Sequence, residues 1–308
     1  MRAAFATYRP DAGLISFHTA MIEVARLEDM RAWSRAEHAR GRRVGFVPTM
    51  GYLHEGHLRL VDRARELSDV VAMSIFVNPL QFGPTEDLAR YPRDLERDRA
   101  LARARAVAAV FVPDSAALYP RAPSVRLDPG VMAHSLEGAA RPGHFAGVLT
   151  VVTKLFHVVE PDIAVFGRKD FQQAMLVRRM SADLDFPIVI DIMPTVRELD
   201  GLALSSRNSY LSPDDRRSAL ALSRCLREVE KAWRGGQADP ARLTTRGLEV
   251  LTVPGVTPEY LAFVDDELQP VDRVTQTTVA LVAARVGSTR LIDNVVLGEG
   301  VSADPTIR

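Results

Sequence analysis

Apolar residues along the chain follow two spacings, which predict two kinds of element. Short continuous runs that end at Gly, Pro or Asn are typical of buried strands, whereas apolar residues three or four apart predict helices. The predicted strands are residues 43–47, 70–77, 107–112, 162–166 and 187–192, and the predicted helices are residues 27–40, 58–66, 94–106, 145–159 and 170–182. Because these strands alternate with helices, we predict right-handed βαβ units and a mostly parallel sheet.

The alternation stops near residue 195. Two helical patterns (213–234 and 239–251) precede three strand-like runs (259–265, 278–286 and 290–297). Helices followed by a block of strands predict a smaller α+β domain. The fold class is therefore α/β, with an N-terminal extension over 1–22, a parallel-sheet domain over 23–195 and an α+β domain over 196–308.

Composition narrows the class of protein. The 308 residues carry no formal net charge, which argues against a general nucleic-acid binder. No apolar segment is long enough to span a bilayer, and Arg9, Pro10 and Asp11 interrupt any signal-peptide core. We expect a cytoplasmic protein with no membrane partner. The lone cysteine, Cys225, excludes a disulfide within the chain, and its helical context predicts a buried residue.

The first candidate site follows the strand at 43–47. The segment Pro48–His57 combines a Gly-containing turn with the start of a predicted helix, and it carries His54 and His57 around Gly56. Free N–H groups and the positive end of a helix form a site for anions. The chain lacks the P-loop and Gly-x-Gly-x-x-Gly motifs, and the spacing of the two histidines gives little support for a zinc site. A surface or capping role is the alternative for either histidine alone.

A second cluster follows the strand at 162–166. Gly167 permits close backbone approach, Lys169 can pair with phosphate, and Asp170 can accept ribose hydroxyls or cap the next helix. Only three of the 39 basic residues are lysines, which favours a functional role for Lys169. Gln173 lies one turn further on and can face the same cleft.

Three further groups are weaker candidates alone. Ser205, Ser206 and Arg207 lie on the junction between the predicted domains and could close over a triphosphate. Arg141 precedes a predicted helix, where a solvated arginine is the alternative. The amides of Asn78, Gln81 and Gln173 suit the orientation of a hydroxy acid, with ordinary loop amides as the alternative.

Together these segments resemble one enzyme family. PTMGYLHEGH (48–57), FVNPLQFGPTEDLARYPRDLERD (76–98), LEGAARPGHFAGVLTVVTKLF (136–156), FGRKDFQQ (166–173) and VRELDGLALSSRNSYLS (196–212) are similar to the motifs of pantoate–β-alanine ligases, in the same order. The resemblance implies the Rossmann-like fold of the nucleotidylyltransferase superfamily, with His54–His57 as its His-x-Gly-His signature. It also implies a homodimer and two steps: pantoate and ATP give pantoyl adenylate and pyrophosphate, then β-alanine displaces AMP.

The resemblance also implies roles by position. Catalytic roles fall on His57, as proton donor, and on His54, Lys169, Ser205, Ser206 and Arg207. Pantoate would contact Gln81 and Gln173, β-alanine would contact Gln81, and Asn78 and Arg141 would lie near the reacting groups. Mg²⁺ is expected with ATP, without an identified protein ligand. ATP contacts are implied for Met50, Gly51, Tyr52, Leu53, His54, Glu55, Gly56, His57, Gly167, Arg168, Lys169, Asp170, Val196, Leu204, Ser205, Ser206 and Arg207.

Three positions depart from the family pattern. Arg168 stands where Glu is usual, Leu204 where Met is frequent, and Tyr52 where a smaller residue is typical. Arg168 would add a cation beside the phosphates. Two alternatives stay open: another adenylyl or cytidylyl transferase of this fold, and a non-catalytic nucleotide-binding relative. A tRNA synthetase is disfavoured, because the chain is short and lacks a basic region.

Overall fold

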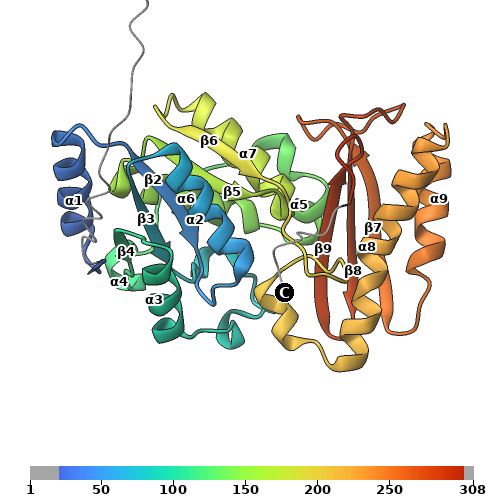
Figure 1. Cartoon of the computed structure of the whole chain (residues 1–308), viewed down its shortest axis with the longest axis horizontal. Coiled ribbons are helices and arrows are strands. Elements are labelled where there is room, and N and C mark those ends of the chain that lie inside the picture. The colour runs from blue at the N-terminus through green and yellow to red at the C-terminus, as the bar shows by residue number, and fades with distance from the viewer. Residues whose placement is uncertain (1–20, 302–308) are drawn as a thin grey trace, which may run out of the picture.

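A six-stranded parallel sheet forms the N-terminal half of the protein (Figure 1), in a computed structural model that describes residues 21–301. The strand order is β1-β4-β3-β2-β5-β6, and every neighbouring pair is parallel. The chain reverses its direction of winding between the central strands β2 and β5. The strands are β1 (Ile22–Val24), β2 (Val44–Thr49), β3 (Val70–Ile75), β4 (Ala109–Phe111), β5 (Ile163–Gly167) and β6 (Val189–Met193).

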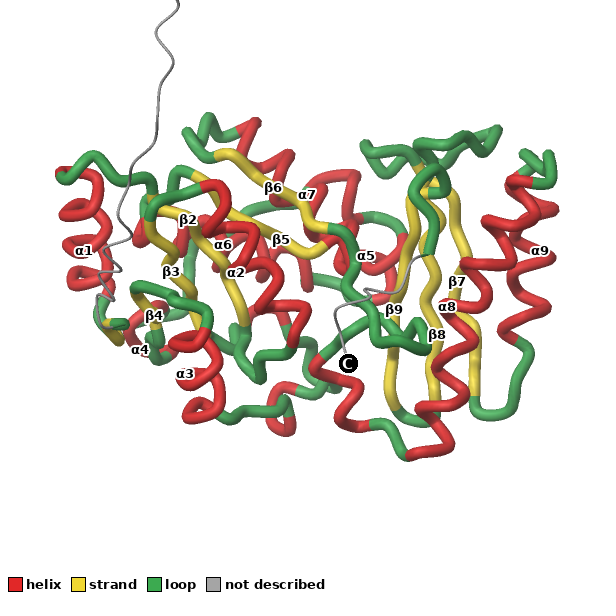
Figure 2. The backbone as a smooth tube through the Cα atoms, in the orientation of Figure 1, coloured by secondary structure: helices red, strands yellow, loops and turns green. Residues whose placement is uncertain are grey.

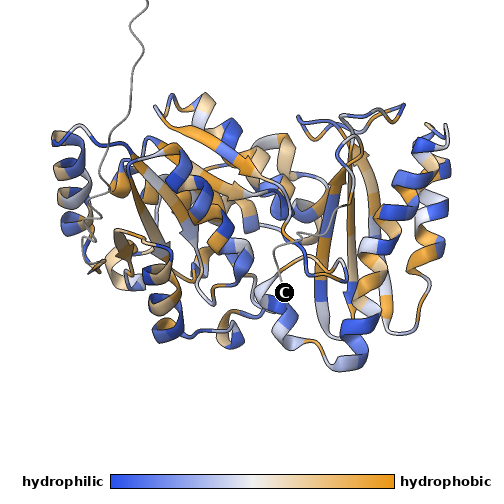
Figure 3. Ribbon diagram, in the orientation of Figure 1, coloured by the Kyte–Doolittle hydropathy of each residue, from blue (hydrophilic) through white to orange (hydrophobic). Residues whose placement is uncertain are grey.

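Helices cover both faces of this sheet. On one face α2 (Glu55–Leu67) and α3 (Leu95–Ala104) pack Val61, Ala64 and Ala102 against strand residues such as Met73. On the other face the core includes side chains of α1 (Leu27–Ala39), α6 (His144–Val159) and α7 (Phe171–Asp183). Because both faces are covered, the central strands are mostly apolar, as Figure 3 shows, whereas the edge strand β6 carries Asp191. The short helices α4 (Ser115–Leu118) and α5 (Leu136–Ala140) lie in the connection from β4 to α6.

The C-terminal half is a three-stranded antiparallel sheet with two helices on its outer side (Figure 2). Strands β7 (Val256–Val264), β8 (Val279–Val286) and β9 (Thr289–Val296) bury alternate side chains under α8 (Pro213–Arg234) and α9 (Pro240–Leu251). Val264, Val279 and Leu281 on the other face join the core of the parallel sheet. The two halves are therefore packed through apolar contacts as well as polar ones.

The predicted fold class is confirmed, with differences at particular elements. Residues 1–20 of the predicted extension lie outside the described residues, but its last residue, Ile22, belongs to β1, which pairs with β4. A three-residue strand is too short to show a period. Helix α2 begins at Glu55 instead of 58, so His57 lies inside its first turn. Gly56 weakens the helical pattern there.

Cys225 is fully buried in α8, and burial raises the pKa of its thiol to about 12, so it is a core residue. Within residues 21–301, none of the helices combines the length and apolar character needed to cross a membrane.

Candidate active site

The candidate site lies where β2 and β5 end beside one another. In open parallel sheets, ligands bind outside the carboxyl ends of strands where the winding direction reverses. Here β2 leads into the turn before α2, and β5 leads into the one-turn 3-10 helix η4 (Arg168–Asp170). The two clusters predicted from the sequence are therefore neighbours.

The turn after β2 is held by a buried carboxylate. Asp98 of α3 accepts the N–H of Tyr52 through Oδ2 and the N–H of Leu53 through Oδ1, both at 2.7 Å. Tyr52 has φ of 50°, a left-handed conformation that is unfavourable for residues with a Cβ atom. The preceding residue, Gly51, has φ of 80°, which glycine adopts easily. The two hydrogen bonds to Asp98 stabilise this backbone, which sets the entry angle of α2.

His54 and His57 stack at the start of α2, with their ring centroids 4.0 Å apart. The backbone N–H of His54 donates to His57 Nδ1 at 3.3 Å, so the proton of a neutral His57 ring is on Nε2. Burial is the main cause that lowers the pKa of His54 to about 2 and that of His57 to about 4. Both imidazoles are neutral near pH 7, and Nδ1 of His54 has no partner among the described residues.

Lys169 and Asp170 lie on η4 and line the same cavity as these histidines. Lys169 Nζ is 3.4 Å from Asp170 Oδ1. Burial raises the pKa of the Asp170 carboxyl, but the cations of Lys169 and Arg207 outweigh it and lower the pKa below its usual value. The Asp170 side chain makes no capping hydrogen bond to α7, which removes the capping role considered from the sequence.

The amide of Gln81 is oriented by Asn78. Asn78 Nδ2 donates to Gln81 Oε1 and to the carbonyl of Gly147, both at 3.1 Å, and Asn78 Oδ1 accepts from Tyr119 Oη at 2.9 Å. Gln81 Nε2 then faces the cavity beside Met50 Sδ, at 3.3 Å. One amide hydrogen of Asn78 thus orients Gln81, while the other anchors Asn78 to the backbone of α6.

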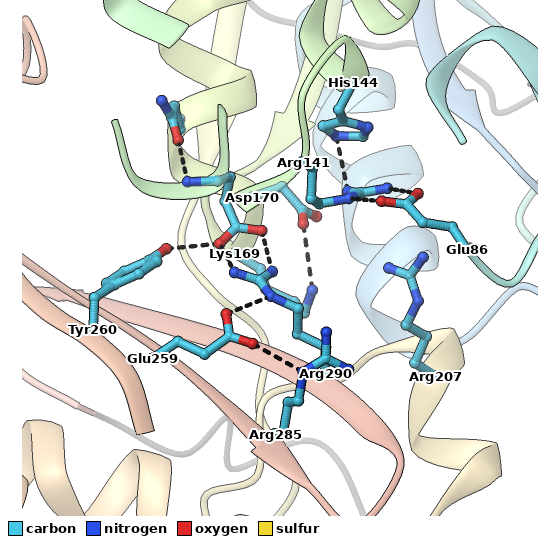
Figure 4. A network of polar contacts seen from close by, with 12 residues as sticks. Glu86, Arg141, His144, Lys169, Asp170, Arg207, Glu259, Tyr260, Arg285 and Arg290 are labelled. Atoms are coloured by element: carbon cyan, nitrogen blue, oxygen red, sulfur yellow. Dashed lines mark hydrogen bonds and ion pairs between the residues drawn. The ribbon is translucent and has the colours of Figure 1, made fainter. Parts of the chain in front are cut away.

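Arg141 is bound rather than solvated. Its Nε and Nη2 donate to the two carboxylate oxygens of Glu86, both at 2.7 Å, and its Nη1 lies 3.0 Å from His144 Nε2 (Figure 4). His144 Nδ1 lies 2.8 Å from the carbonyl of Gln81. Burial and then the Arg141 cation lower the pKa of His144 to about 4, so the neutral ring donates to Gln81 and accepts from Arg141.

The junction between the two halves brings Arg207 to the same place. The 3-10 helix η5 (Ser206–Tyr210) carries Arg207, whose Nε and Nη2 donate to the two oxygens of Asp87 at 2.9 Å. Ser205 Oγ accepts from the Arg207 N–H at 3.3 Å, and Ser206 Oγ donates to the Tyr52 carbonyl at 3.4 Å. These contacts dock the junction against the turn after β2.

Most predicted site residues line one cavity of about 220 Å³. They are Met50, His54, Gly56, His57, Asn78, Gln81, Arg141, Gly167, Lys169, Asp170, Gln173, Val196, Leu204, Ser205, Ser206 and Arg207. A second cavity of about 250 Å³ opens toward the C-terminal sheet and shares Lys169, Asp170, Gln173 and Arg207. On its far wall lie Tyr260 and Arg290, both labelled in Figure 4; Tyr260 Oη and Arg290 Nη2 donate hydrogen bonds to Glu137 Oε1 at 2.8 and 2.7 Å.

Five residues on the predicted ATP list line neither cavity: Gly51, Tyr52, Leu53, Glu55 and Arg168. Leu53 is fully buried, and Glu55 Oε1 accepts from Arg105 Nη2 at 2.8 Å. The guanidinium of Arg168 binds Glu299, with Nη1 to Oε1 at 3.0 Å. The side chains of Leu53, Glu55 and Arg168 are therefore directed away from both cavities, and the guanidinium of Arg168 is paired with Glu299.

Sequence reasoning assigned no role to several groups that shape the site. Asp87 and Glu86 bind the two arginines, Asp98 holds the turn, and His144 supports Gln81. The acidic residues lie within the segment 76–98, whose alternation of carboxylates and arginines was the available signal. Which carboxylate meets which arginine depends on tertiary contacts.

The fold and the site define a class of protein. A parallel sheet with a His-x-Gly-His turn and a lysine-bearing loop at its switch point is the arrangement of a nucleotide-binding enzyme of the nucleotidylyltransferase type.

Comparisons with known proteins identify the family. The sequence model described as pantoate-beta-alanine ligase matches residues 23–296. The pantothenate synthetase of Moorella thermoacetica is 51% identical over 271 residues, which is 87% of this chain and 95% of that protein. That of Deinococcus radiodurans is 52% identical over 267 residues, or 84% of this chain and 95% of the relative.

Solved structures agree. The pantothenate synthetase of Thermus thermophilus superposes with a TM-score of 0.85 at 47% identity, covering 90% of this chain and 99% of the other. The pantoate-beta-alanine ligase of Francisella tularensis, complexed with beta-gamma ATP and beta-alanine, superposes with a TM-score of 0.75 at 33% identity. The match covers 92% of this chain and 100% of that chain. The chain belongs to the pantoate-beta-alanine ligase family, and it is an enzyme.

Proposed function

We propose that this ligase works in two steps at the cavity beyond the carboxyl ends of β2 and β5. The carboxylate of pantoate attacks the α-phosphorus of ATP, and the bond to the bridging oxygen breaks, releasing pyrophosphate. The amine of β-alanine then attacks the acyl carbon of pantoyl adenylate, and AMP leaves. The observation that supports this proposal is the convergence of His57, Lys169 and Arg207 on one cavity that also holds oriented neutral amides.

Charge on the transferring phosphate would be stabilised from three elements. Lys169 comes from η4, Ser205, Ser206 and Arg207 from the junction, and His54 and His57 from the start of α2. Donors fixed before the reaction stabilise developing charge more effectively than water, which must reorient. Gly167, Asp170 and Val196 line the same cavity, where they would contact the ribose and adenine.

His57 would act first as a hydrogen-bond donor. With Nδ1 occupied by the N–H of His54, the neutral ring presents its Nε2–H. A bound triphosphate opposes the desolvation that lowers the His57 pKa, so the ring can take up a proton at Nδ1, in place of the hydrogen bond that Nδ1 accepts from the His54 N–H. The Nε2 proton can then pass to the leaving pyrophosphate. This is the proton-donor role that the resemblance implied.

Pantoate would be held by uncharged donors. Gln81 Nε2 and Gln173 line the cavity, and Asn78 and Arg141 position Gln81 from behind. Neutral amides orient a carboxylate without pairing so strongly that its nucleophilicity is lost. Gln81 lies at the side of the cavity that faces the bound Arg141, which is where we place the incoming β-alanine.

We propose that Mg²⁺ arrives with ATP. Among the described residues there is no group of three or more His, Cys, Asp or Glu side chains suited to hold a metal. The acids near the cavity are engaged, Asp87 with Arg207 and Glu86 with Arg141. These contacts fit a Mg²⁺ held by phosphate oxygens and water, where it neutralises part of the triphosphate charge.

We further propose a cytoplasmic homodimer. The edge strand β6 has no neighbour on its outer side within residues 21–301; its first residue, Val189, is 59% exposed, and Leu184, which precedes it in the chain, is 49% exposed. Exposed strand edges of this kind pair readily with a second copy. Sedimentation of the purified protein would show a mass of twice one chain, and a monomer would contradict this.

The two-step reaction is tested by pyrophosphate release from ATP, Mg²⁺ and pantoate, with and without β-alanine. We expect pantoate-dependent pyrophosphate, followed by AMP and pantothenate when β-alanine is added. Release that does not depend on pantoate would favour another nucleotidyltransferase, and ATP binding without release would favour a non-catalytic relative.

The site assignment is tested by Lys169→Ala and His54→Ala. Each should lower the rate of pyrophosphate release roughly a hundredfold, as for the loss of an oxyanion-hole donor. Lys231→Ala is the matched control, because Lys231 is exposed on α8 and is not part of the cavity lining. Losses below about threefold in both site variants would refute the assignment.

A further inference from the structure

The loop that carries Lys169 is held by a side chain from the other half of the protein. Asn294 of β9 donates both hydrogens of its amide to successive backbone carbonyls, that of Arg168 at 2.8 Å and that of Lys169 at 2.9 Å. Asn294 is only 2% exposed. One buried amide therefore fixes two adjacent peptide groups of η4.

Asn294 is itself fixed by a buried ion pair. Arg197 Nη1 and Nη2 bind the two oxygens of Asp293 at 2.6 and 2.7 Å, and both side chains are 3% exposed. Arg197 Nη2 also donates to the carbonyl of Asn294 at 3.0 Å. Breaking such a pair in a low-dielectric interior is costly, so this part of β9 is a rigid support.

This support matters because the Lys169 side chain is weakly restrained. It is long and flexible, and its ammonium approaches Asp170 at 3.4 Å. The position of the Lys169 ammonium therefore depends on the position of the η4 backbone to which the side chain is attached. A displacement of about 1 Å at a reacting group can lower a rate by up to about a hundredfold.

We infer that Asn294 is a positioning residue for Lys169, through which the C-terminal sheet sets the geometry of adenylyl transfer. The inference rests on the proposed role of Lys169. It also gives the small C-terminal sheet a part in the first step of the reaction, in addition to covering the cleft.

A double-mutant cycle on the first half-reaction tests this. Asn294→Ala should lower kcat for pyrophosphate release about tenfold in the wild-type background, with a smaller effect on the KM for ATP. In the Lys169→Met background the same change should cost less than about twofold, because no ammonium remains to be misplaced. Equal losses in the two backgrounds would mean a general structural role and would overturn the inference.

Glu299→Gln is the matched control. It removes the ion pair that Glu299 makes with Arg168 on the same loop but leaves the amide of Asn294 in place. Because Glu299 is 53% exposed, its pair with Arg168 contributes little, and we expect kcat within about twofold of wild type. If Asn294→Ala does not fold, Asn294→Ser replaces it in the same cycle.

A second readout does not depend on activity. The chain has three lysines, so acetylation of Lys169 by limiting acetic anhydride can be measured by mass spectrometry against exposed Lys231. Asn294→Ala should raise the Lys169 to Lys231 ratio, whereas Glu299→Gln should not. If Lys169→Met leaves the rate unchanged, the proposed catalytic role of Lys169 fails. The acetylation ratio then decides by itself whether Asn294 positions the lysine, and a ratio that Asn294→Ala leaves unchanged overturns the inference.

Discussion

Asp87 binds Arg207 side-on, through two parallel hydrogen bonds of 2.9 Å. Asp87 is 9% exposed and comes from the loop after β3, whereas Arg207 comes from the junction between the two sheets. A guanidinium held by Nε and Nη2 keeps the hydrogens of Nη1 for another acceptor. The pair therefore fixes the orientation of Arg207 while leaving one edge available to a phosphate.

Asp87→Asn should lower kcat for pyrophosphate release about tenfold without raising the KM for ATP. Loss of the paired geometry misplaces Arg207 in the transition state, whereas loss of a negative charge favours binding of the triphosphate. Steady-state kinetics with varied ATP measure both effects. Tyr210→Phe removes a 3.3 Å contact to Asp87 and a 3.1 Å hydrogen bond to the Arg90 carbonyl but leaves the Asp87–Arg207 pair in place, so it is the control expected within about twofold of wild type. An unchanged kcat in Asp87→Asn would contradict the positioning role.

Asn78→Ala should raise the KM for pantoate about tenfold and leave the KM for ATP nearly unchanged. Without Asn78, the amide of Gln81 can rotate and present its oxygen to the pantoate carboxylate. Initial rates with each substrate varied in turn separate the two constants. Tyr119→Phe removes a 2.9 Å hydrogen bond to Asn78 but leaves its contact with Gln81, so it should have a smaller effect. Equal changes in both KM values would argue for a general distortion of the cavity.

Gly56→Ala should separate activity from stability. A Cβ at Gly56 would lie 2.9 Å from the ring of His54, so the ring must move. The same change favours the first turn of α2, because alanine has a helix propensity about 1 kcal/mol better than glycine. We expect an undiminished free energy of unfolding, measured with urea, together with a loss of at least about tenfold in pyrophosphate release. A variant with full activity would show that the ring position of His54 is unimportant.

ATP binding should be accompanied by proton uptake. The pKa of His57 is about 4 in the free protein, mainly because the ring is buried, and the phosphates of ATP should raise it. Since the bound state then holds more protons, affinity increases as pH falls from about 7 toward about 5. Calorimetric titrations of the protein with ATP, in buffers of different ionisation enthalpy, measure the number of protons taken up on binding. A pH near 6 is suitable because imidazole groups titrate in this range. His57→Asn is the control for protons taken up by ATP itself, and equal uptake by both proteins would contradict the prediction.

Much of the fold follows from local pattern. Helices such as α6 and α8 lie within a residue of their predicted bounds, because their apolar faces repeat at helical spacing over many turns. The strands β2, β3 and β5 are apolar along their length because both sheet faces are covered. Strand β1 was not predicted, because three residues carry no periodic signal and it is defined by pairing with β4.

Local pattern is enough to place the turn with His54 and His57 and the loop with Lys169 after two parallel strands, and the chemistry of these side chains follows from their residue types. That Arg168 turns away to Glu299, and that Asn294 supports Lys169 across 125 positions of sequence, depends on tertiary contacts. Local propensity acts over a few residues, whereas an arginine can pair with any carboxylate that folding brings near. With 39 basic and 39 acidic residues, the chain offers many such pairs, and only the packing of the two sheets selects among them.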